Sequence, residues 1–338
     1  MAVSNGEDPR VVVLGDSNAF GFGISKDKTL AAQIGNSLRD RGKEVGVLNA
    51  GVPGYDLLQP ILLMKDLPIH EGMLFVFLVH PVNDLVNSAN EIDYHAHKPY
   101  IYENSGSIYV HNPYSHFPQV DWRFSRDFQK LNQIFNLPGN ERSLLDRLSD
   151  MSALIYMLRY SRSLSFFRSK NEPDEILWDN MSTEEYVNMR LEAIRKQPLQ
   201  VAARFWPEIE QLKNYSSRLI RYAGELYSYV YNYAKENKAH ICVVLAPEPY
   251  SSTPFFMELT DLLQSKLPDF TFQWGSAASE LHKELRRRGI PVILPDYKGA
   301  EPTELMFVPF DDHLSADAYR NISAAVADHH LRMSQNEK

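Results

Sequence analysis

The chain has 338 residues, of which 44% are hydrophobic and 23% charged, a composition typical of a soluble globular protein. Its formal net charge of −8 argues against a nucleic-acid partner, because binding to phosphates requires clustered positive charge. No apolar stretch approaches the ~20 residues that span a bilayer. The single cysteine, Cys242, excludes an intramolecular disulfide. These features are compatible with a cytoplasmic protein and with a periplasmic or secreted protein whose leader has been removed. They are also compatible with any oligomeric state.

The first predicted element is a buried strand over residues 11–14. Four consecutive apolar residues, three of them β-branched, are typical of a strand in a parallel sheet. The strand ends in Gly15-Asp16-Ser17, which places a serine hydroxyl just beyond its carboxyl end. Open α/β sheets bind their ligands at that edge. The same three residues also suit a turn that only caps the next helix, so the functional interpretation depends on the rest of the chain.

Helices and short apolar strands then alternate along the chain. Further strands are predicted over residues 45–48, 73–79, 241–245 and 291–294. Apolar residues at helical spacing predict helices over residues 28–41, 57–65, 208–236, 254–266, 277–288 and 316–333. Because the strands end in polar or glycine-rich loops and helices lie between them, we predict a flavodoxin-like, three-layer α/β/α fold. Its centre is a parallel five-stranded sheet.

The alternation is interrupted between residues 85 and 239. Residues 98–102 and 107–110 flank a polar turn and predict a β-hairpin. An amphipathic helix is predicted around residues 144–158. We interpret 85–239 as a largely helical insertion that forms a cap or wall over the strand ends. Because no flexible linker bounds it, the whole chain, 1–338, is predicted to be a single domain.

A histidine near the end of the chain can supply the base that Ser17 needs. A serine hydroxyl is a poor nucleophile at neutral pH until a base removes its proton. His313 follows the fifth predicted strand and precedes a helix, which puts it at the same edge of the sheet as Ser17. Asp311 and Asp312 each offer a carboxylate to hold the tautomer of that histidine.

Three loops at this edge also offer donors for a developing oxyanion. They supply the Ser17 amide, the Gly54 amide and the Asn83 side chain. Each part is weak evidence alone, but their order and spacing together indicate acyl transfer by a serine nucleophile.

These blocks resemble the SGNH (GDSL-type) hydrolase superfamily. The likeness is carried by Gly15-Asp16-Ser17, Asn49 to Gly54, Asn83-Asp84, and Asp311 with His313, and it covers about residues 10–85 and 240–335. The resemblance implies that Ser17 is the nucleophile and His313 the base. It further implies that the oxyanion donors are the amides of Ser17 and Gly54, with Gly51 as a less favoured alternative to Gly54, and the side chain of Asn83.

The chain departs from the family pattern at two positions. Pro81 stands where the family usually has a glycine, two residues before its asparagine. Phe310 stands three residues before His313, the commoner place for the aspartate. A shorter Asp-x-His spacing occurs among relatives, including O-acetyltransferase-like members, and it selects Asp311. Asp312 is adjacent to the histidine and less able to fold back onto its ring.

The resemblance implies a serine-dependent ester hydrolase with a Ser17–His313–Asp311 triad, an acyl-enzyme intermediate and no metal or organic cofactor. The expected substrate is a small-molecule or glycan ester. A polysaccharide O-acetyltransferase with the same triad is one alternative, and a non-catalytic binding protein on the same fold is another. His95 and His97 have a metal-like spacing, but no nearby ligand set completes a site, so none is predicted.

Four polar residues near these blocks are predicted to have structural roles. We expect Asp16 and Asp84 to tie loops together and Asp56 to cap the helix after the second strand. Ser315 is expected to cap the last helix.

Overall fold

The computed structural model describes four long stretches of the chain, residues 9–88, 213–246, 277–295 and 313–336. It also describes residues 92–93, 96–97, 100–104, 107–111, 207–208, 273–274 and 306–307, and single helical positions at 185, 188, 192, 195, 258, 261, 262 and 265. The sheet, its covering helices and both Ser17 and His313 lie in the long stretches.

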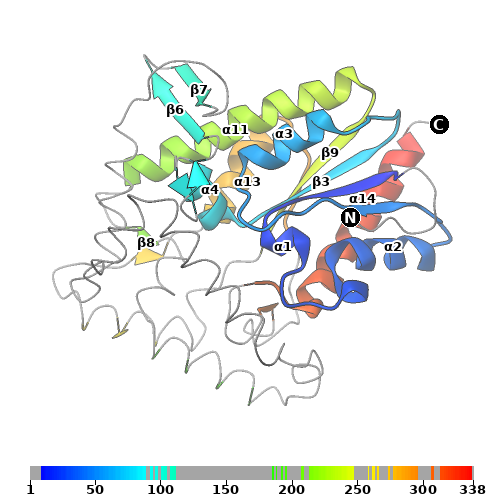
Figure 1. Ribbon diagram of the computed structural model, residues 1–338, viewed down its shortest axis with the longest axis horizontal. Coiled ribbons are helices and arrows are strands. Elements are labelled where there is room, and N and C mark those ends of the chain that lie inside the picture. The colour runs from blue at the N-terminus through cyan, green and yellow to red at the C-terminus, as the bar shows by residue number, and fades with distance from the viewer. Residues whose placement is uncertain are drawn as a thin grey trace, which may run out of the picture.

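Five parallel strands form the centre of the molecule (Figure 1). They are β1 (Val11–Gly15), β2 (Val47–Asn49), β3 (Leu74–Val79), β9 (His240–Leu245) and β11 (Val292–Ile293). Across the sheet the strands lie in the order β11-β9-β3-β1-β2. When only these five are numbered along the chain, this is the order 2-1-3-4-5 read from the β2 edge, which is the flavodoxin-like order. The predicted fold class is confirmed.

Helices cover both faces of the sheet (Figure 1). The helices α3 (Leu58–Asp66), α11 (Lys213–Glu236) and α13 (Ala277–Arg287) share a buried cluster with one face, and α2 (Leu30–Asp40) and α14 (Ala316–Asn336) with the other. Strand β1 supplies both clusters, because successive side chains of a strand point to opposite faces. Val12 and Leu14 enter the first cluster, whereas Val11 and Val13 enter the second. Cys242 is buried in the second, and burial raises the pKa of its thiol to about 12.

Short helices and two-stranded ribbons complete the described elements. They are α1 (Ser17–Phe20), the 3-10 helix η1 (Lys26–Lys28), α4 (Pro81–Ser88), and the pairs β4 (Ile92–Asp93) with β5 (Ala96–His97), β6 (Tyr100–Asn104) with β7 (Ser107–His111), and β8 (Pro207–Glu208) with β10 (Gln273–Trp274). The antiparallel pair β6–β7 is the predicted hairpin. The helix predicted around 144–158 lies outside the described residues. None of the helices described here combines the length and apolarity that crossing a membrane requires.

Helix α11 lies inside the range predicted as an insertion, yet it is one layer of the core. Leu219, Ala223 and Val230 are buried in the same cluster as strands β1, β3 and β9. The helix begins at Lys213, not at residue 208 as its apolar spacing predicts. Pro207–Glu208 instead pairs with Gln273–Trp274 in an antiparallel ribbon. The ring of Pro207 fixes a φ that an extended strand also adopts, and proline has no N–H to donate within a helix.

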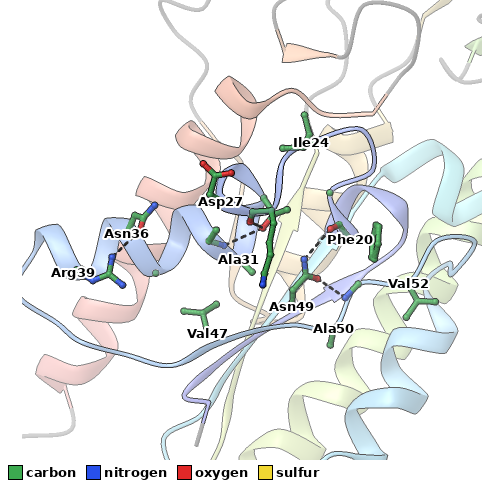
Figure 2. A pocket seen from close by; sticks show the side chains of 16 residues that line it. Phe20, Ile24, Asp27, Ala31, Asn36, Arg39, Val47, Asn49, Ala50 and Val52 are labelled. Atoms are coloured by element: carbon green, nitrogen blue, oxygen red, sulfur yellow. Dashed lines mark hydrogen bonds between the residues drawn. The ribbon is translucent and has the colours of Figure 1, made fainter. Parts of the chain in front are cut away.

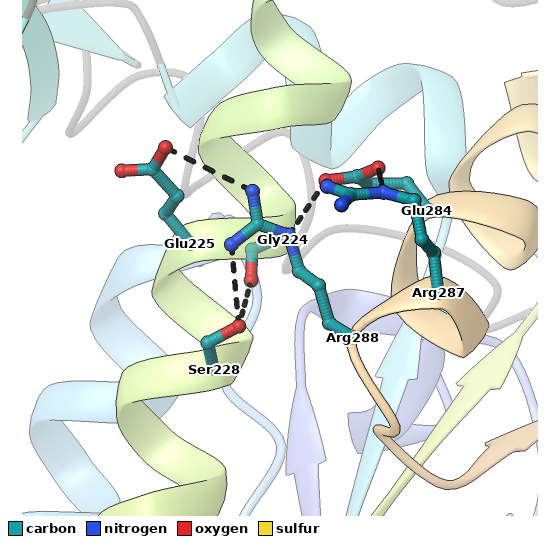
Figure 3. A network of polar contacts seen from close by, with 6 residues as sticks. All are labelled: Gly224, Glu225, Ser228, Glu284, Arg287 and Arg288. Carbon is teal, nitrogen blue, oxygen red and sulfur yellow. Dashed lines mark hydrogen bonds and ion pairs between the residues drawn. The ribbon is translucent and has the colours of Figure 1, made fainter.

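A charged clamp joins α11 to α13 (Figure 3). The guanidinium of Arg288 donates from Nε to Glu284 Oε1 at 2.6 Å and lies 3.8 Å from the Glu225 carboxylate. Gly224 makes room for this pair, because a Cβ at that position would lie 2.7 Å from Arg288 Nε. Arg287 donates to both oxygens of Glu284. Glu284 thus holds two arginines where the two helices meet.

We expect Glu284→Gln to destabilise the fold by about 1 kcal/mol at pH 7, because both arginines lose a charged partner. The hydrogen bond from Arg287 is the largest cause of the lowered pKa of Glu284; burial opposes it, and Arg288 adds to it. A carboxyl whose folded pKa is depressed stabilises the protein above its ordinary value of 4.5, and this stability is lost as pH falls through the folded pKa.

Urea denaturation at pH 7 and at successively lower pH measures this difference. The gap between wild type and Glu284→Gln should shrink below pH 4.5, the ordinary pKa of the group. Glu44→Gln, which changes an exposed loop carboxylate, is the matched control and should leave stability unchanged. A gap that stays constant down to low pH would contradict the electrostatic role of Glu284.

Candidate functional site

Ser17 is the first residue of the short helix α1, directly beyond the end of strand β1. The sequence places it in a loop, and the structure differs because Asp16 caps a helical turn: its carboxylate accepts from the Asn18 amide at 2.8 Å. Asp16 was predicted to tie loops together, and this bond instead makes it the cap of α1. The first turn of a helix leaves its backbone amides without intrahelical partners. The Ser17 amide, at the first position of α1, therefore has no acceptor within the helix.

His313 reaches Ser17 from the far end of the sequence. Its Nε2 lies 2.8 Å from Ser17 Oγ, and the two residues are 296 positions apart. His313 precedes α14, whose first turn is capped by Ser315 through a bond from the Ala318 amide at 3.3 Å, as predicted. A serine hydroxyl and an imidazole nitrogen at this distance form the unit that activates a serine nucleophile.

Asn18 holds the two halves of this pair together. Its side-chain Oδ1 accepts from the Leu314 amide at 2.9 Å, and its backbone carbonyl accepts from the Tyr319 hydroxyl at 2.6 Å. Both Asn18 and Tyr319 are buried. One asparagine thus links the residue after the nucleophile to the residue after the histidine. Sequence reasoning missed this role, because nothing in the local pattern around Asn18 indicates a contact so distant in the chain.

For the esterase activity that the sequence predicts, Asn18→Ala should lower kcat for an acetate ester by about 10- to 100-fold, because a displacement of about 1 Å between reacting groups is sufficient for a loss of this size. The change also leaves the buried Leu314 amide without its acceptor, which should cost about 1–3 kcal/mol of stability. Kinetics at a temperature where the variant is folded separate the two effects. Asn36→Ala, an exposed asparagine on α2, is the matched control. Wild-type kcat in Asn18→Ala would contradict the positioning role.

The turn after β2 packs closely against helix α1. A Cβ on Gly51 would lie 2.2 Å from the Phe20 nitrogen, so only glycine fits there. The Gly51 amide already donates to Asn49 Oδ1 at 3.0 Å, and Asn49 Nδ2 donates to the Phe20 carbonyl at 3.1 Å. Gly54 lies three residues further on, at a turn with φ of +83°. The Gly51 amide is therefore already engaged, and the assignment of Gly54 as an oxyanion donor stays a prediction.

Asn83 lies within helix α4 and is exposed, whereas the sequence places it in a loop. Pro81 begins the helix, and proline is favoured at a first helical position because its missing N–H needs no partner there. The Asn83 Oδ1 accepts from Asn87 Nδ2 at 3.0 Å, which leaves the Asn83 amide nitrogen to serve as a donor. Asp84 accepts from the His80 amide at 2.8 Å and so ties α4 to the end of β3, as predicted.

The helix after β2 begins with the cap that the sequence predicts. Asp56 Oδ1 accepts from the Leu58 amide at 2.7 Å, and Gln59 Oε1 accepts from the Asp56 amide at 3.1 Å. This reciprocal pair is a capping box. The capping residue Asp56 lies two residues after Gly54, and α3 begins at Leu58.

The remaining predicted catalytic residue, Asp311, lies outside the described residues, as does its alternative Asp312. Among the residues that the structure describes, no three His, Cys, Asp or Glu side chains are grouped closely enough to hold a metal ion. The chemistry of the site therefore depends on the pair Ser17–His313 together with the predicted oxyanion donors.

A cavity of about 970 Å³ lies beside the site, between α2 and β2 (Figure 2). Apolar or small residues such as Ala31, Gly35 and Val47 line it together with Phe20 of α1, and Asn36 and Arg39 of α2 add polar groups. Neither Ser17 nor His313 lines this cavity. The cavity therefore lies against α1, whose first residue is Ser17, without being lined by Ser17 itself.

An aromatic ring that sequence reasoning missed packs on His313. The ring centroids of Phe22 and His313 lie 4.8 Å apart, with 35° between their planes. Phe22 lies between Gly21 and Gly23, and a phenylalanine between two glycines was the available signal in the sequence.

No protein-family model matches this chain, and no curated protein is detectably similar to it in sequence.

Proposed function

We propose that the chain is a serine-dependent ester hydrolase of the SGNH type, acting on an acylated small molecule or carbohydrate. The observation that supports this most strongly is the 2.8 Å approach of His313 Nε2 to Ser17 Oγ at the carboxyl edge of a parallel sheet. The motif blocks around Ser17, Gly54, Asn83 and His313 support the same family.

In the proposed first step, Ser17 Oγ attacks the ester carbonyl carbon while His313 Nε2 takes the hydroxyl proton. The carbonyl oxygen becomes an oxyanion, which the amides of Ser17 and Gly54 and the side chain of Asn83 stabilise by hydrogen bonds. The tetrahedral intermediate then collapses: the bond to the alcohol oxygen breaks, and His313 returns its proton to that oxygen. An acyl-serine remains.

In the second step, water attacks the acyl carbon while His313 Nε2 takes a proton from it. The bond from the acyl carbon to Ser17 Oγ then breaks, His313 returns the proton to Oγ, and the carboxylic acid and free Ser17 are formed. Asp311 is proposed to orient His313 and to stabilise its protonated form. The bonds to carbon form and break between Ser17, the ester and water, and His313 carries each proton, so the proposal requires no metal or organic cofactor.

An O-acetyltransferase is the second candidate function. It uses the same acyl-serine but passes the acetyl group to a sugar hydroxyl in place of water. The observation that favours it is the short spacing Asp311-x-His313, which occurs among acetyltransferase-like members of the family that this chain resembles.

The experiment measures acetate release from p-nitrophenyl acetate and from an acetylated glycan, with and without an unacetylated glycan as acceptor. Acetate release that needs no acceptor supports the hydrolase. Acetyl transfer to the acceptor that exceeds acetate release supports the transferase. Binding of the glycan with neither reaction, unaffected by Ser17→Ala, would overturn both and favour the non-catalytic binding protein.

A further inference from the structure

The half-exposed ring of Phe22 has no role in the acyl-transfer steps above. One part of it packs on His313, at 4.8 Å between ring centroids. Even so, 49% of the Phe22 surface remains exposed. When a ligand covers an aromatic side chain that is half exposed to water, the free energy of the complex falls, because apolar surface is removed from water.

The chemistry of acyl transfer places the alcohol part of an ester next to this ring. His313 Nε2 must give its proton to the alcohol oxygen, so that oxygen has to come within hydrogen-bond reach of Nε2. The carbonyl oxygen turns instead toward the donors of Ser17, Gly54 and Asn83. The alcohol therefore departs past the His313 ring, on which Phe22 is packed.

We propose that Phe22 forms a wall of the alcohol subsite and selects esters whose alcohol carries a ring. This inference rests on the proposed function. A flat aromatic face makes its best contacts with another flat face, which an aromatic ring or the C–H-rich face of a pyranose offers and a short alkyl chain does not. Esters of cyclic alcohols, acetylated sugars among them, are the substrate class that this wall fits.

Phe20 provides a matched control from the same turn of chain. It is 48% exposed, nearly the same as Phe22. Its side chain, however, lines the cavity between α2 and β2, which His313 does not line (Figure 2). Removing the Phe20 ring changes exposed aromatic surface equally but leaves the surroundings of His313 intact.

The test measures kcat/KM of wild type, Phe22→Leu, Phe22→Tyr and Phe20→Leu for benzyl, n-heptyl and ethyl acetate. Because kcat/KM includes only the steps up to acylation, the shared acetyl-serine does not mask differences between the alcohols. Relative to wild type, Phe22→Leu should lower kcat/KM for benzyl acetate about three- to tenfold more than for the other two esters, the size of an aromatic pair contact. Phe22→Tyr should keep the benzyl preference, and Phe20→Leu should keep all three values within about twofold.

Equal losses for all three esters would overturn the inference, because Phe22 would then act only through the packing of His313. A loss for n-heptyl acetate as large as that for benzyl acetate would overturn the preference for rings. The same selective loss in Phe20→Leu would also contradict it. If wild type hydrolyses none of the esters, the proposed function itself fails and the inference with it, a result distinct from turnover without ring preference.

Discussion

Replacing Ser17 by alanine is expected to lower kcat/KM for p-nitrophenyl acetate by at least about 1,000-fold while the protein stays folded. Without the hydroxyl no acyl-serine forms, and the remaining oxyanion donors and binding contacts give only the residual catalysis seen when a serine triad loses its nucleophile. Because Ser17 is partly exposed at the start of α1, the loss of one oxygen leaves no cavity in the core.

Thermal unfolding followed by circular dichroism should give the same midpoint for Ser17→Ala and wild type. Ser25→Ala is the matched control, since this serine lies only eight positions further along the chain. Its activity should stay within about twofold of wild type. Full activity in Ser17→Ala would contradict the assignment of the nucleophile, and equal loss in Ser25→Ala would indicate damage to the loop.

Replacing His313 by alanine is expected to lower kcat/KM by a similar factor, about 1,000-fold or more, because Ser17 then has no base at 2.8 Å. Residues that act as one unit are not additive in their effects. The double variant Ser17→Ala/His313→Ala should therefore be about as inactive as either single variant. Steady-state kinetics of the three variants, compared as a double-mutant cycle, measure this coupling.

His70→Ala is the control for His313→Ala, because His70 is exposed and precedes strand β3, at the edge of the sheet opposite to Ser17. It should behave as wild type. Added imidazole should restore part of the activity of His313→Ala and none of that of Ser17→Ala, since it replaces the base but not the nucleophile. Losses that simply multiply in the double variant would show that Ser17 and His313 act independently and would contradict the proposed pair.

The layered fold was predictable because its signals are local. Val11 to Leu14 and Leu74 to Val79 are unbroken apolar runs, which a strand buried on both faces requires. The capping residues Asp56 and Ser315 are likewise visible within a few positions of the helices they begin. In each case the residues that decide the structure are neighbours in the chain.

Contacts between distant parts of the chain were less predictable. The ribbon of Pro207–Glu208 with Gln273–Trp274 pairs two residues on each side, too few for a periodic pattern. The link from Asn18 to Leu314 and the packing of Phe22 on His313 each join the chain just after β1 to the residues just before α14. Such contacts form only when the whole chain is folded, and they leave no periodic pattern in the sequence of either segment.

The site shows both situations. Parallel strands have their carboxyl ends at one edge of the sheet, so the placement of Ser17 after β1 and His313 after β11 at the same edge was predictable, whereas their 2.8 Å contact was not. The prediction that Asn83 lies in a loop was wrong, although Pro81, a favoured first helical residue, is a local signal of the helix. The choice between Asp311 and Asp312 as the acid depends on loop geometry outside the described residues.

Mapping the serine that a fluorophosphonate modifies is the most direct test of the central proposal, that His313 activates Ser17 as a nucleophile. The protein is treated with the reagent, and the modified peptide is identified by mass spectrometry. The account predicts modification at Ser17 in wild type and His70→Ala, a reaction at least about 100-fold slower in His313→Ala, and none at this position in Ser17→Ala. Modification of a different serine, or labelling of Ser17 at the wild-type rate without His313, would contradict it.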